Sequence, residues 1–347
     1  MRYRSLGSTG VNVSTYCLGA MMFGAFGNTD HDDSIAIIHK ALDAGVNFVD
    51  SADVYSGGES ETIVGKALAG RRDNVVLATK FHGPMGPDRN QKGNSRRWII
   101  TEVESSLRRL QTEWIDLYQV HRPEPETDID DTLSALSDLV HAGKIRYAGC
   151  STFPAEAIVE SHWVAERRGH ERFRCEQPPY SILARGIETS VLPTCQRYGM
   201  GVIAWSPLNG GWLSGGRHLK DETGRIPPSR RAVMLPRFDP TTPASQRKVD
   251  VLPRLEEIAA DAGTTLIGLS LGFVLAHPGV TSAIVGPRTH QHLDGQLAVA
   301  DVQLDDETLD RIDEVVPPGV NLDPADAGYV TPAEESAWRR RRPNGRR

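Results

Sequence analysis

Four side chains capable of acid–base chemistry stand at or near the ends of apolar runs in this chain. Asp50 ends the run NFVD and Tyr55 follows it by five residues. Lys80 ends VVLATK, and His121 ends LYQVH. If these runs are neighbouring parallel strands, their ends lie within about 10 Å of one another, because adjacent strands are about 4.8 Å apart. A carboxylate, a phenol, an amine and an imidazole at one place predict a proton-delivering site, and therefore an enzyme.

Each of these residues also has a simpler explanation when it is taken alone. Asp50 and Lys80 can form a plain buried ion pair. Tyr55 can be an ordinary loop tyrosine, and His121 can merely bond a backbone carbonyl. Asp50 and His121 also allow a metal site. Metal-dependent barrel hydrolases commonly place H-x-H at the end of their first strand, however, and this chain has none there. We therefore predict no metal.

The elements that must position these side chains alternate regularly between strand and helix. Apolar runs predict strands at 17–19, 46–50, 74–80, 115–121, 144–151, 173–177, 201–206 and 281–286. Helical spacing of apolar residues predicts helices over 31–45, 59–68, about 103–110, 133–143, from 154, over 188–199, over 251–277 and from about 290.

Eight such units predict an α/β fold, a (β/α)₈ TIM barrel. The strands are too apolar to face water, which is typical of a parallel sheet covered by helices. A doubly wound nucleotide-binding sheet is the alternative, but it should open with G-x-G-x-x-G after its first strand. Here the first strand leads into CLGAMMFGAFG, whose glycines have the wrong spacing. Residues 1–16 are predicted to form a short hairpin that plugs the amino-terminal end of the barrel.

Two segments fall outside this pattern. Residues 209–250 form a Gly-, Pro- and Arg-rich insert after the seventh strand, a long loop of the kind that serves as a lid or binding loop, or is disordered. Residues 318–347 are Pro-rich and end in AWRRRRPNGRR. We predict one domain over 1–318 and a solvated Pro/Arg-rich tail over 319–347, with nucleic-acid binding by the basic run as a weak alternative.

The bulk properties set limits on partners and location. The chain has 347 residues and a net charge of −6, which argues against nucleic acid as a general partner. No apolar run approaches the ~20 residues of a membrane span, and the N-terminus has no signal-peptide core. The four cysteines are scattered without a C-x-x-C pair. We expect these cysteines to be reduced and buried, which is typical of a cytoplasmic protein. We predict no membrane partner, and a homo-oligomer is possible.

A second group of polar residues ends the later strands and predicts a binding site. It contains Ser151, Gln177, Trp205, Ser206 and Arg288. Hydroxyl, amide, flat ring and cation together suit a ligand with an amide, an aromatic ring and a phosphate.

With both groups in view, the chain resembles the aldo-keto reductases over essentially residues 1–318. The matching stretches are NFVDSADVYSGGESETIVGKAL, the lysine of LATK, DLYQVHRP, GKIRYAGCSTF, EQPPYS, IAWSPLNGGWLSG and VGPRT. Each stretch alone is a weak signal, but their occurrence in order is highly specific. The resemblance implies NADPH-dependent reduction of an aldehyde or ketone to an alcohol.

The resemblance also implies which residues bind NADPH (or NADP⁺). They are Ala20, Met21, Asp50, Ser151, Thr152, Gln177, Trp205, Ser206, Leu208, Gly210, Gly211, Arg217, Arg231, Gly286, Arg288, His292 and Gln296. Arg288 matches the residue that binds the 2′-phosphate, which favours NADPH over NADH.

Several of these positions depart from the family pattern or have another explanation. Thr152 stands where the family usually has asparagine. His292 and Gln296 fall in a stretch where Gln, Glu and Asn are common. Trp205 can be a core tryptophan, and Arg217 and Arg231 can be solvated charges of the insert.

In the implied chemistry, Tyr55 is the general acid that protonates the carbonyl oxygen. A free tyrosine has a pKa near 10, and an adjacent ammonium lowers it. Lys80 is expected to lower the pKa of Tyr55, Asp50 to fix Lys80, and His121 to orient the oxygen. Phe23, Tyr55 and His121 are the expected substrate contacts.

The sequence leaves the substrate and two rival functions open. The basic insert hints at an anionic or phosphorylated carbonyl compound such as a nucleotide-linked sugar. One rival is a non-catalytic NADP(H)-binding regulatory subunit, like the channel-associated members of the family. The other is an NAD-linked alcohol or sugar dehydrogenase.

Overall fold

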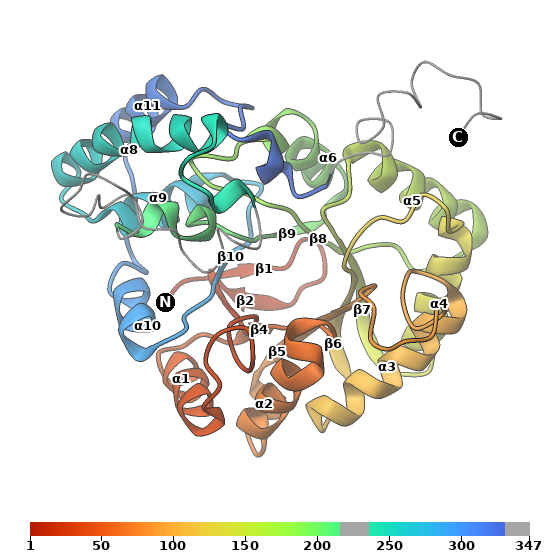
Figure 1. Ribbon diagram of the computed structural model, residues 1–347. Helices are drawn as coiled ribbons and strands as arrows, with labels where there is room; N and C mark the ends of the chain where they lie inside the picture. The colour runs from red at the N-terminus through yellow and green to blue at the C-terminus, as the bar shows by residue number, and fades with distance from the viewer. Residues whose placement is uncertain (216–235, 330–347) are drawn as a thin grey trace.

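Eight parallel strands close into a barrel in the computed structural model, which describes residues 1–215 and 236–329 (Figure 1). The strands are β3 (Tyr16–Gly19), β4 (Phe48–Asp50), β5 (Val76–Phe81), β6 (Ile115–Val120), β7 (Ile145–Ser151), β8 (Cys175–Gln177), β9 (Gly201–Ala204) and β10 (Ser282–Val285). Each strand pairs with its neighbour in the chain, and β10 pairs with β3 to complete the ring. The predicted (β/α)₈ barrel is confirmed.

One helix follows each strand and covers the outside of the barrel (Figure 1). These helices are α1 (His31–Asp43), α2 (Glu59–Leu68), α3 (Arg96–Leu110), α4 (Ile129–His141), α5 (Ala155–Arg168), α6 (Val191–Tyr198), α9 (Leu266–Ala276) and α10 (His290–Leu297). Helix α1 illustrates why the sequence forms these helices. The Asp30 carboxylate accepts hydrogen bonds from the free amides of the first turn. Ile37, Ile38 and Ala41 form its buried face.

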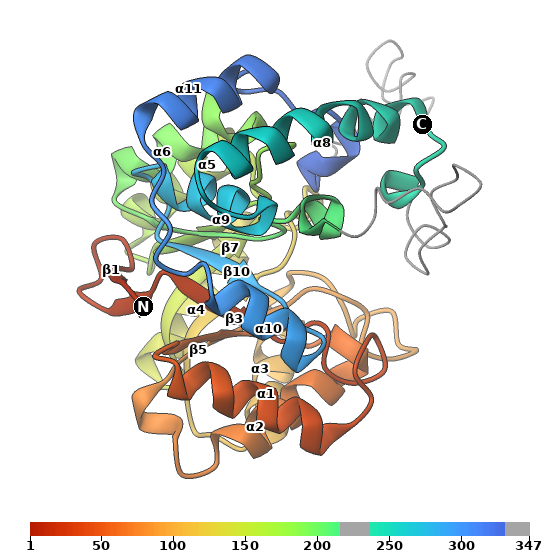
Figure 2. The ribbon, with the colours of Figure 1, turned by 90° about the vertical axis from the view of Figure 1, so that its left-hand side faces the viewer.

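A hairpin of β1 (Tyr3–Ser5) and β2 (Asn12–Ser14) closes one end of the barrel, as predicted. In Figure 2 it lies at the left-hand end. Leu6 and Val13 are buried in the hydrophobic cluster inside the barrel. The contact is close: a Cβ on Gly201, at the start of β9, would lie 2.6 Å from the Leu6 side chain.

Inward-facing residues recur with a period of two along the strands, because successive side chains of a strand point to opposite faces. An apolar layer next to the hairpin contains Phe48, Ala78, Leu117, Cys175 and Ile203. Two residues further along the same strands stand Asp50, Lys80, Gln119, Gln177 and Trp205. The barrel interior therefore changes from apolar to polar toward the carboxyl ends of the strands. All four cysteines are buried and unpaired, as expected.

The helical part of the insert differs from the prediction. Helix α8 (Pro243–Asp261) begins eight residues before the predicted start at 251, because Thr242 caps its first turn. The predicted single helix over 251–277 is wrong, since α8 and α9 are bent by 85° at a break. Gly263, at φ +66°, and the capping Thr265 account for the break.

Among the described residues, α8 and one further helix lie outside the eightfold pattern. Helix α11 (Asp306–Val315) was not predicted, and it packs on α8, outside α9 (Figure 2). Among the described helices, none alone is long and apolar enough to cross a membrane. By length and composition alone, only the bent pair of α8 and α9 passes that test.

The segment after α11 packs against the barrel. Leu322 donates its amide to the Leu183 carbonyl, and the short helix η6 (Pro324–Ala327) follows. Asp323 and Asp326 are each 4% exposed. A solvated tail from residue 319 onward is therefore wrong for these residues. Residues 330–347 of the predicted tail lie outside the described residues.

Candidate active site

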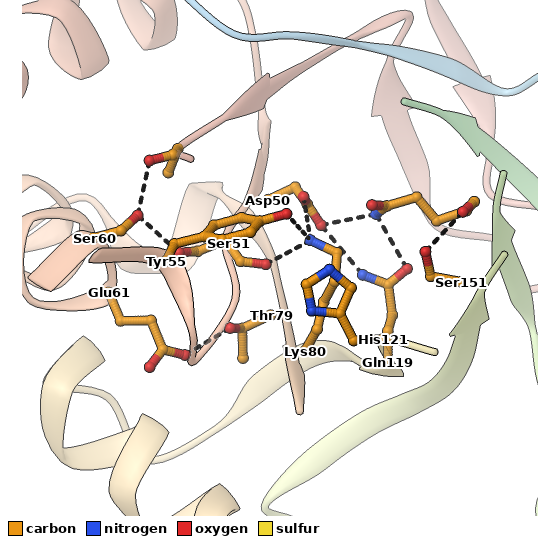
Figure 3. A network of polar contacts seen from close by, with 12 residues as sticks. Asp50, Ser51, Tyr55, Ser60, Glu61, Thr79, Lys80, Gln119, His121 and Ser151 are labelled. Atoms are coloured by element: carbon orange, nitrogen blue, oxygen red, sulfur yellow. Dashed lines mark hydrogen bonds and ion pairs between the residues drawn. The ribbon is translucent and has the colours of Figure 1, made fainter. Parts of the chain in front are cut away.

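The structure brings Asp50, Tyr55, Lys80 and His121 together at the carboxyl ends of β4–β6 (Figure 3). The Lys80 ammonium donates to Asp50 Oδ2 at 2.6 Å, to the Ser51 carbonyl at 2.6 Å and to the Tyr55 hydroxyl at 3.4 Å. The His121 ring meets the Tyr55 ring edge-on, with 5.8 Å between centroids. The Tyr55 hydroxyl, the Lys80 ammonium and the His121 imidazole therefore lie close together.

Two amide side chains hold the other oxygen of Asp50. Gln119 Nε2 donates to Asp50 Oδ1 at 3.2 Å, and Gln177 Nε2 donates to the same atom at 2.9 Å. Ser151 Oγ in turn donates to the Gln177 carbonyl at 2.8 Å. Asp50 is thus fixed from two sides, and it links the acid–base group to the residues at the ends of β7 and β8.

Burial and charge act in opposite directions on the two central groups. Burial alone would lower the pKa of the Lys80 ammonium, but Asp50 and Tyr55 raise it above its ordinary value. For Tyr55, burial raises the pKa more than Lys80 lowers it, so the net direction is upward. The expectation that Lys80 brings the pKa of Tyr55 below its usual value is therefore wrong. Tyr55 is protonated at neutral pH, as a proton donor must be.

His121 is held neutral in this environment. Burial, followed by the positive charges of Lys80 and Arg122, keeps its pKa well below the usual value. A neutral imidazole can still donate one hydrogen bond to a carbonyl oxygen. Across residues 1–215 and 236–329, no three His, Cys, Asp or Glu side chains converge as metal ligands.

A second network supports the site from behind. Thr79, next to Lys80 on β5, donates to Glu61 Oε1 at 2.6 Å (Figure 3). Glu61 is also paired with Arg109, at 2.6 Å. The Arg109 side chain lies under the turn that carries Tyr55, where a Cβ on Gly58 would be only 2.7 Å from Arg109 Cδ. Helices α2 and α3 therefore hold the turn at a fixed height.

The predicted cofactor residues at the ends of β7–β9 lie side by side, because these strands are neighbours. Thr152 and Ser206 adopt φ angles of +62° and +58°, conformations rare for residues other than glycine. Such backbone strain clusters at functional sites. Trp205 follows β9, and its indole nitrogen is buried without a hydrogen-bond partner.

The loop after β9 is shaped by its own bonds. Gly210 donates its amide to Ser206 Oγ at 3.0 Å, and Gly210 and Gly211 have φ angles of +65° and +100°. Asn209, between them and Leu208, donates to Asp326 Oδ2 at 3.0 Å. Asp326 is paired with the buried Lys248 at 2.6 Å. The segment after α11 is thus attached to the predicted cofactor loop.

The remaining predicted cofactor residues frame the ends of β3 and β10. Ala20 donates its amide to the Asp50 carbonyl, and Met21 beside it is 39% exposed. Gly286, Arg288 and His292 are exposed, and the Arg288 amide donates to His292 Nδ1 at 3.4 Å. Gln296 is buried. Arg217 and Arg231 lie outside the described residues.

Unpartnered polar atoms agree with a ligand along these residues. Trp205 Nε1, Asn209 Oδ1 and Gln296 Oε1 are all buried and have no hydrogen-bond partner. Buried polar atoms are nearly always bonded in folded proteins, although some buried atoms elsewhere in this chain, such as Trp98 Nε1 and Tyr118 Oη, also lack a partner. Together with the strained loop and the exposed Arg288 cation, the first three atoms fit a long ligand with an amide and phosphates, which is the chemistry of a nicotinamide dinucleotide.

The role of Phe23 as a substrate contact stays a prediction. Phe23 is fully buried in the hydrophobic core. Phe26, in the same loop, is 55% exposed, and its amide donates to Ser56 Oγ in the turn that carries Tyr55. Phe26 is therefore the apolar group of this loop that is open to solvent beside Tyr55, and nothing in the sequence distinguished it from Phe23.

Other residues at the site were also missed. Gln119 stands two positions before His121 on β6, so the period of two along a strand was a usable signal. Arg122 donates to the His121 carbonyl at 2.8 Å and to Thr152 Oγ1 at 2.9 Å. Arg237 lies over the Trp205 ring, 5.6 Å from its centroid, and no local pattern indicated this contact.

Comparisons with known proteins agree with this arrangement. The model of the Aldo/keto reductase family matches residues 16–317. The chain is 36% identical to "Uncharacterized oxidoreductase YrpG" of Bacillus subtilis, over 91% of this chain and 96% of that protein. It is 34% identical to "Probable voltage-gated potassium channel subunit beta" of Arabidopsis thaliana, over 91% and 97%. It is 32% identical to "Aldo-keto reductase YhdN" of Bacillus subtilis, over 96% and 98%. The match to the family model spans the barrel and all four residues of the acid–base group, and the chain belongs to the aldo/keto reductase family.

Proposed function

We propose that this protein reduces an aldehyde or ketone to an alcohol with NADPH, and that Tyr55 is the general acid. The observation that supports it most is the position of the Tyr55 hydroxyl, 3.4 Å from the Lys80 ammonium and beside the His121 ring. NADPH, when bound, supplies the hydride. The residues of this chain supply the proton and the orientation of the carbonyl group.

The carbonyl oxygen of the substrate binds between Tyr55 and His121. As negative charge develops on this oxygen, the Tyr55 hydroxyl donates its proton and His121 donates a second hydrogen bond. Lys80 stabilises the phenolate that remains, since an ammonium at 3.4 Å favours the charged form of the phenol. Asp50 keeps Lys80 charged and in place.

The cofactor is bound along the ends of β7–β10. Ser151, Thr152 and Gln177 are proposed to bind the carboxamide, and Trp205 to stack on the nicotinamide ring. Ser206, Leu208, Gly210 and Gly211 are proposed to line the pyrophosphate. Arg288 binds the 2′-phosphate, for which its exposed, always-charged guanidinium is suited.

A second candidate function is that of a regulatory subunit that binds NADP(H) and does not catalyse a reaction. It is favoured by the relatives from Arabidopsis thaliana and Oryza sativa, each 34% identical and each named as a probable potassium channel subunit beta. The complete set of Asp50, Tyr55, Lys80 and His121 favours the reductase.

Two measurements test the proposal. Fluorescence titration compares the Kd values of NADPH and NADH, and a lower Kd for NADPH is expected because Arg288 pairs with the 2′-phosphate. Equal values contradict that role and favour an NAD-linked dehydrogenase. Single-turnover oxidation of bound NADPH by 4-nitrobenzaldehyde is then followed by absorbance. Tight NADPH binding without oxidation would refute the reductase and support the subunit.

A further inference from the structure

Two arginines from distant parts of the chain converge on one tryptophan at the mouth of the barrel. Arg122 follows His121 at the end of β6, and Arg237 lies in the short helix η5 (Pro236–Phe238). Their guanidinium carbons are 5.9 Å and 5.6 Å from the centroid of the Trp205 ring. Two positive charges are thus placed within one small region beside the acid–base group.

Among the described residues, neither arginine is in ion-pair contact with a carboxylate, and the carboxyl group that acts on Arg122 from a distance is the buried Glu176. Arg122 donates only to neutral acceptors, the His121 carbonyl and Thr152 Oγ1. Arg237 lies against the Phe238 ring, at 4.8 Å, and its Nε is buried without a hydrogen-bond partner. Within the part of the chain that the structure describes, neither arginine is paired with a carboxylate.

Two other arginines of low exposure are each paired with two carboxylates. Arg109 is paired with Glu61 and Glu102, and Arg185 is paired with Glu188 and Asp313. Burying a charge without a counter-charge is costly, so such pairing is the rule. Burial lowers the pKa of the Arg122 guanidinium most. Tyr55 and the buried Glu176 raise it, and repulsion by Arg237 lowers it again, so the net direction is downward, although an arginine stays charged at neutral pH. An anion between the two arginines would relieve this repulsion.

The position of Arg122 connects this region to the reacting group. Arg122 is the next residue after His121, and its charge acts directly on the pKa values of both His121 and Tyr55. One small molecule can therefore place a carbonyl oxygen between Tyr55 and His121 and an acidic group beside Arg122.

We propose that Arg122 and Arg237 form an anion subsite that binds the carboxylate of the carbonyl substrate. The preferred substrates are then aldehydes or ketones that carry an acidic group. This proposal rests on the proposed reductase activity and specifies its substrate class. Planar, bidentate hydrogen bonding makes arginine well suited to a carboxylate.

The test compares two aldehydes of similar shape, 4-carboxybenzaldehyde and 4-nitrobenzaldehyde. The wild-type protein should have the higher kcat/KM for the carboxylate. A charge-assisted hydrogen bond is worth about 1.5–3 kcal/mol, so Arg237→Gln should lower the ratio of the two kcat/KM values about 10- to 100-fold, mainly through KM. Arg122→Gln should lower the ratio in the same direction. Arg254→Gln, in an exposed ion pair with Glu257, is the matched control and should leave the ratio unchanged.

Three results would overturn the proposal. One is an equal loss of kcat/KM for both aldehydes in Arg237→Gln. Another is a higher NADPH Kd in that variant with an unchanged ratio, because the pair would then bind a cofactor phosphate. The third is calorimetry showing benzoate binding equally to wild-type protein and Arg237→Gln. Calorimetry needs no turnover, so it decides the proposal even if NADPH binds and neither aldehyde is reduced, which would refute only the reductase.

Discussion

The ammonium of Lys80 lies 3.4 Å from the hydroxyl oxygen of Tyr55, and both groups are largely shielded from water. Because Lys80 is fully buried and also bonded to Asp50, it cannot turn away from the phenol without breaking an ion pair. The phenol therefore has one fixed cation beside it before and after it loses its proton. Most of the expected behaviour of the site follows from this contact.

Replacing Tyr55 by phenylalanine removes the proton donor and leaves the ring. We expect kcat for the reduction of 4-nitrobenzaldehyde to fall about 10²- to 10⁴-fold, which is the usual contribution of general acid catalysis. The Kd of NADPH, measured by fluorescence titration, should stay near its original value. Substantial carbonyl reduction by Tyr55→Phe would show that the proton comes from another group.

The pH dependence of reduction follows from the raised pKa of Tyr55. Because the phenol must be protonated, and burial keeps its pKa above the usual value of about 10, kcat should stay level between about pH 7 and pH 9. It should fall only above about pH 10. Lys80→Met removes the group that lowers this pKa, so the alkaline fall should move to higher pH. Circular dichroism checks that this variant folds, and Lys80→Arg, which keeps the charge, is the second variant. A fall centred below pH 9 in the wild type would contradict the raised pKa.

Glu176 should make the protein less stable as the pH rises. Burial raises its pKa to about 7 in the folded state, above its ordinary value of 4.5. Between these two values the folded state holds the proton and the unfolded state does not, so the free energy of unfolding falls with rising pH. The full effect is roughly 3 kcal/mol.

Glu176→Gln should therefore raise Tm at pH 8 and change it little at pH 5. Thermal unfolding at the two pH values measures this difference. Glu160→Gln, on the exposed surface of α5, is the control and should shift Tm equally little at both. The same Tm shift at both pH values for Glu176→Gln would contradict the prediction.

The turn that carries Tyr55 offers a matched pair of glycines. Gly57 and Gly58 both have positive φ angles, +65° and +94°, so alanine is strained at either position. A Cβ at Gly57 meets nothing within 4 Å, whereas one at Gly58 would lie 2.7 Å from Arg109 Cδ. Gly58→Ala should therefore lower kcat more than Gly57→Ala, while both lose about 1 kcal/mol of stability from backbone strain. Equal kcat values would show that Arg109 does not set the height of the turn.

The ion pair between Lys248 and Asp326 should matter for cofactor binding. Asp326→Asn removes the nearer of the two carboxylates paired with the buried Lys248 ammonium, leaving Asp323 at 3.6 Å, and weakens the bond to Asn209 in the loop after β9. We expect a lower Tm and a higher NADPH Kd. The triple variant Lys248→Met, Asp323→Asn and Asp326→Leu should recover Tm, since it leaves no buried charge unpaired and an uncharged group can replace a buried ion pair. Its NADPH Kd should stay high because the bond to Asn209 is still missing. An unchanged NADPH Kd in both variants would contradict the role of this contact.

Much of the barrel and of the acid–base group is predictable from the sequence because both depend on local patterns. Period-two alternation and helical spacing locate the strands and helices, and the strand ends locate Asp50, Lys80 and His121. The break between α8 and α9 is also local, but the apolar pattern continues across Gly263 and hides it.

What could not be predicted depends on contacts between distant segments. Asn209 and Asp326 are 117 residues apart, and no local pattern joins them. The contact of Arg237 with Trp205 is of the same kind. The net direction of the pKa shift of Tyr55 could not be predicted from the sequence either. It depends on the balance between the Lys80 charge, which lowers the pKa, and burial by the whole fold, which raises it. Phe23 and Phe26 differ only in how the loop after β3 folds back.

The hairpin of β1 and β2 limits the routes by which solvent and ligands reach the interior of the barrel. Because Leu6 and Val13 seal one end, and Lys80 has no exposed surface, the described part of the chain leaves the opposite rim as the way in for solvent. In the proposed reaction, the proton that Tyr55 donates is replaced through the same rim by which the carbonyl substrate enters and the alcohol leaves. Under this proposal, reprotonation of Tyr55 and release of the alcohol share one route to solvent.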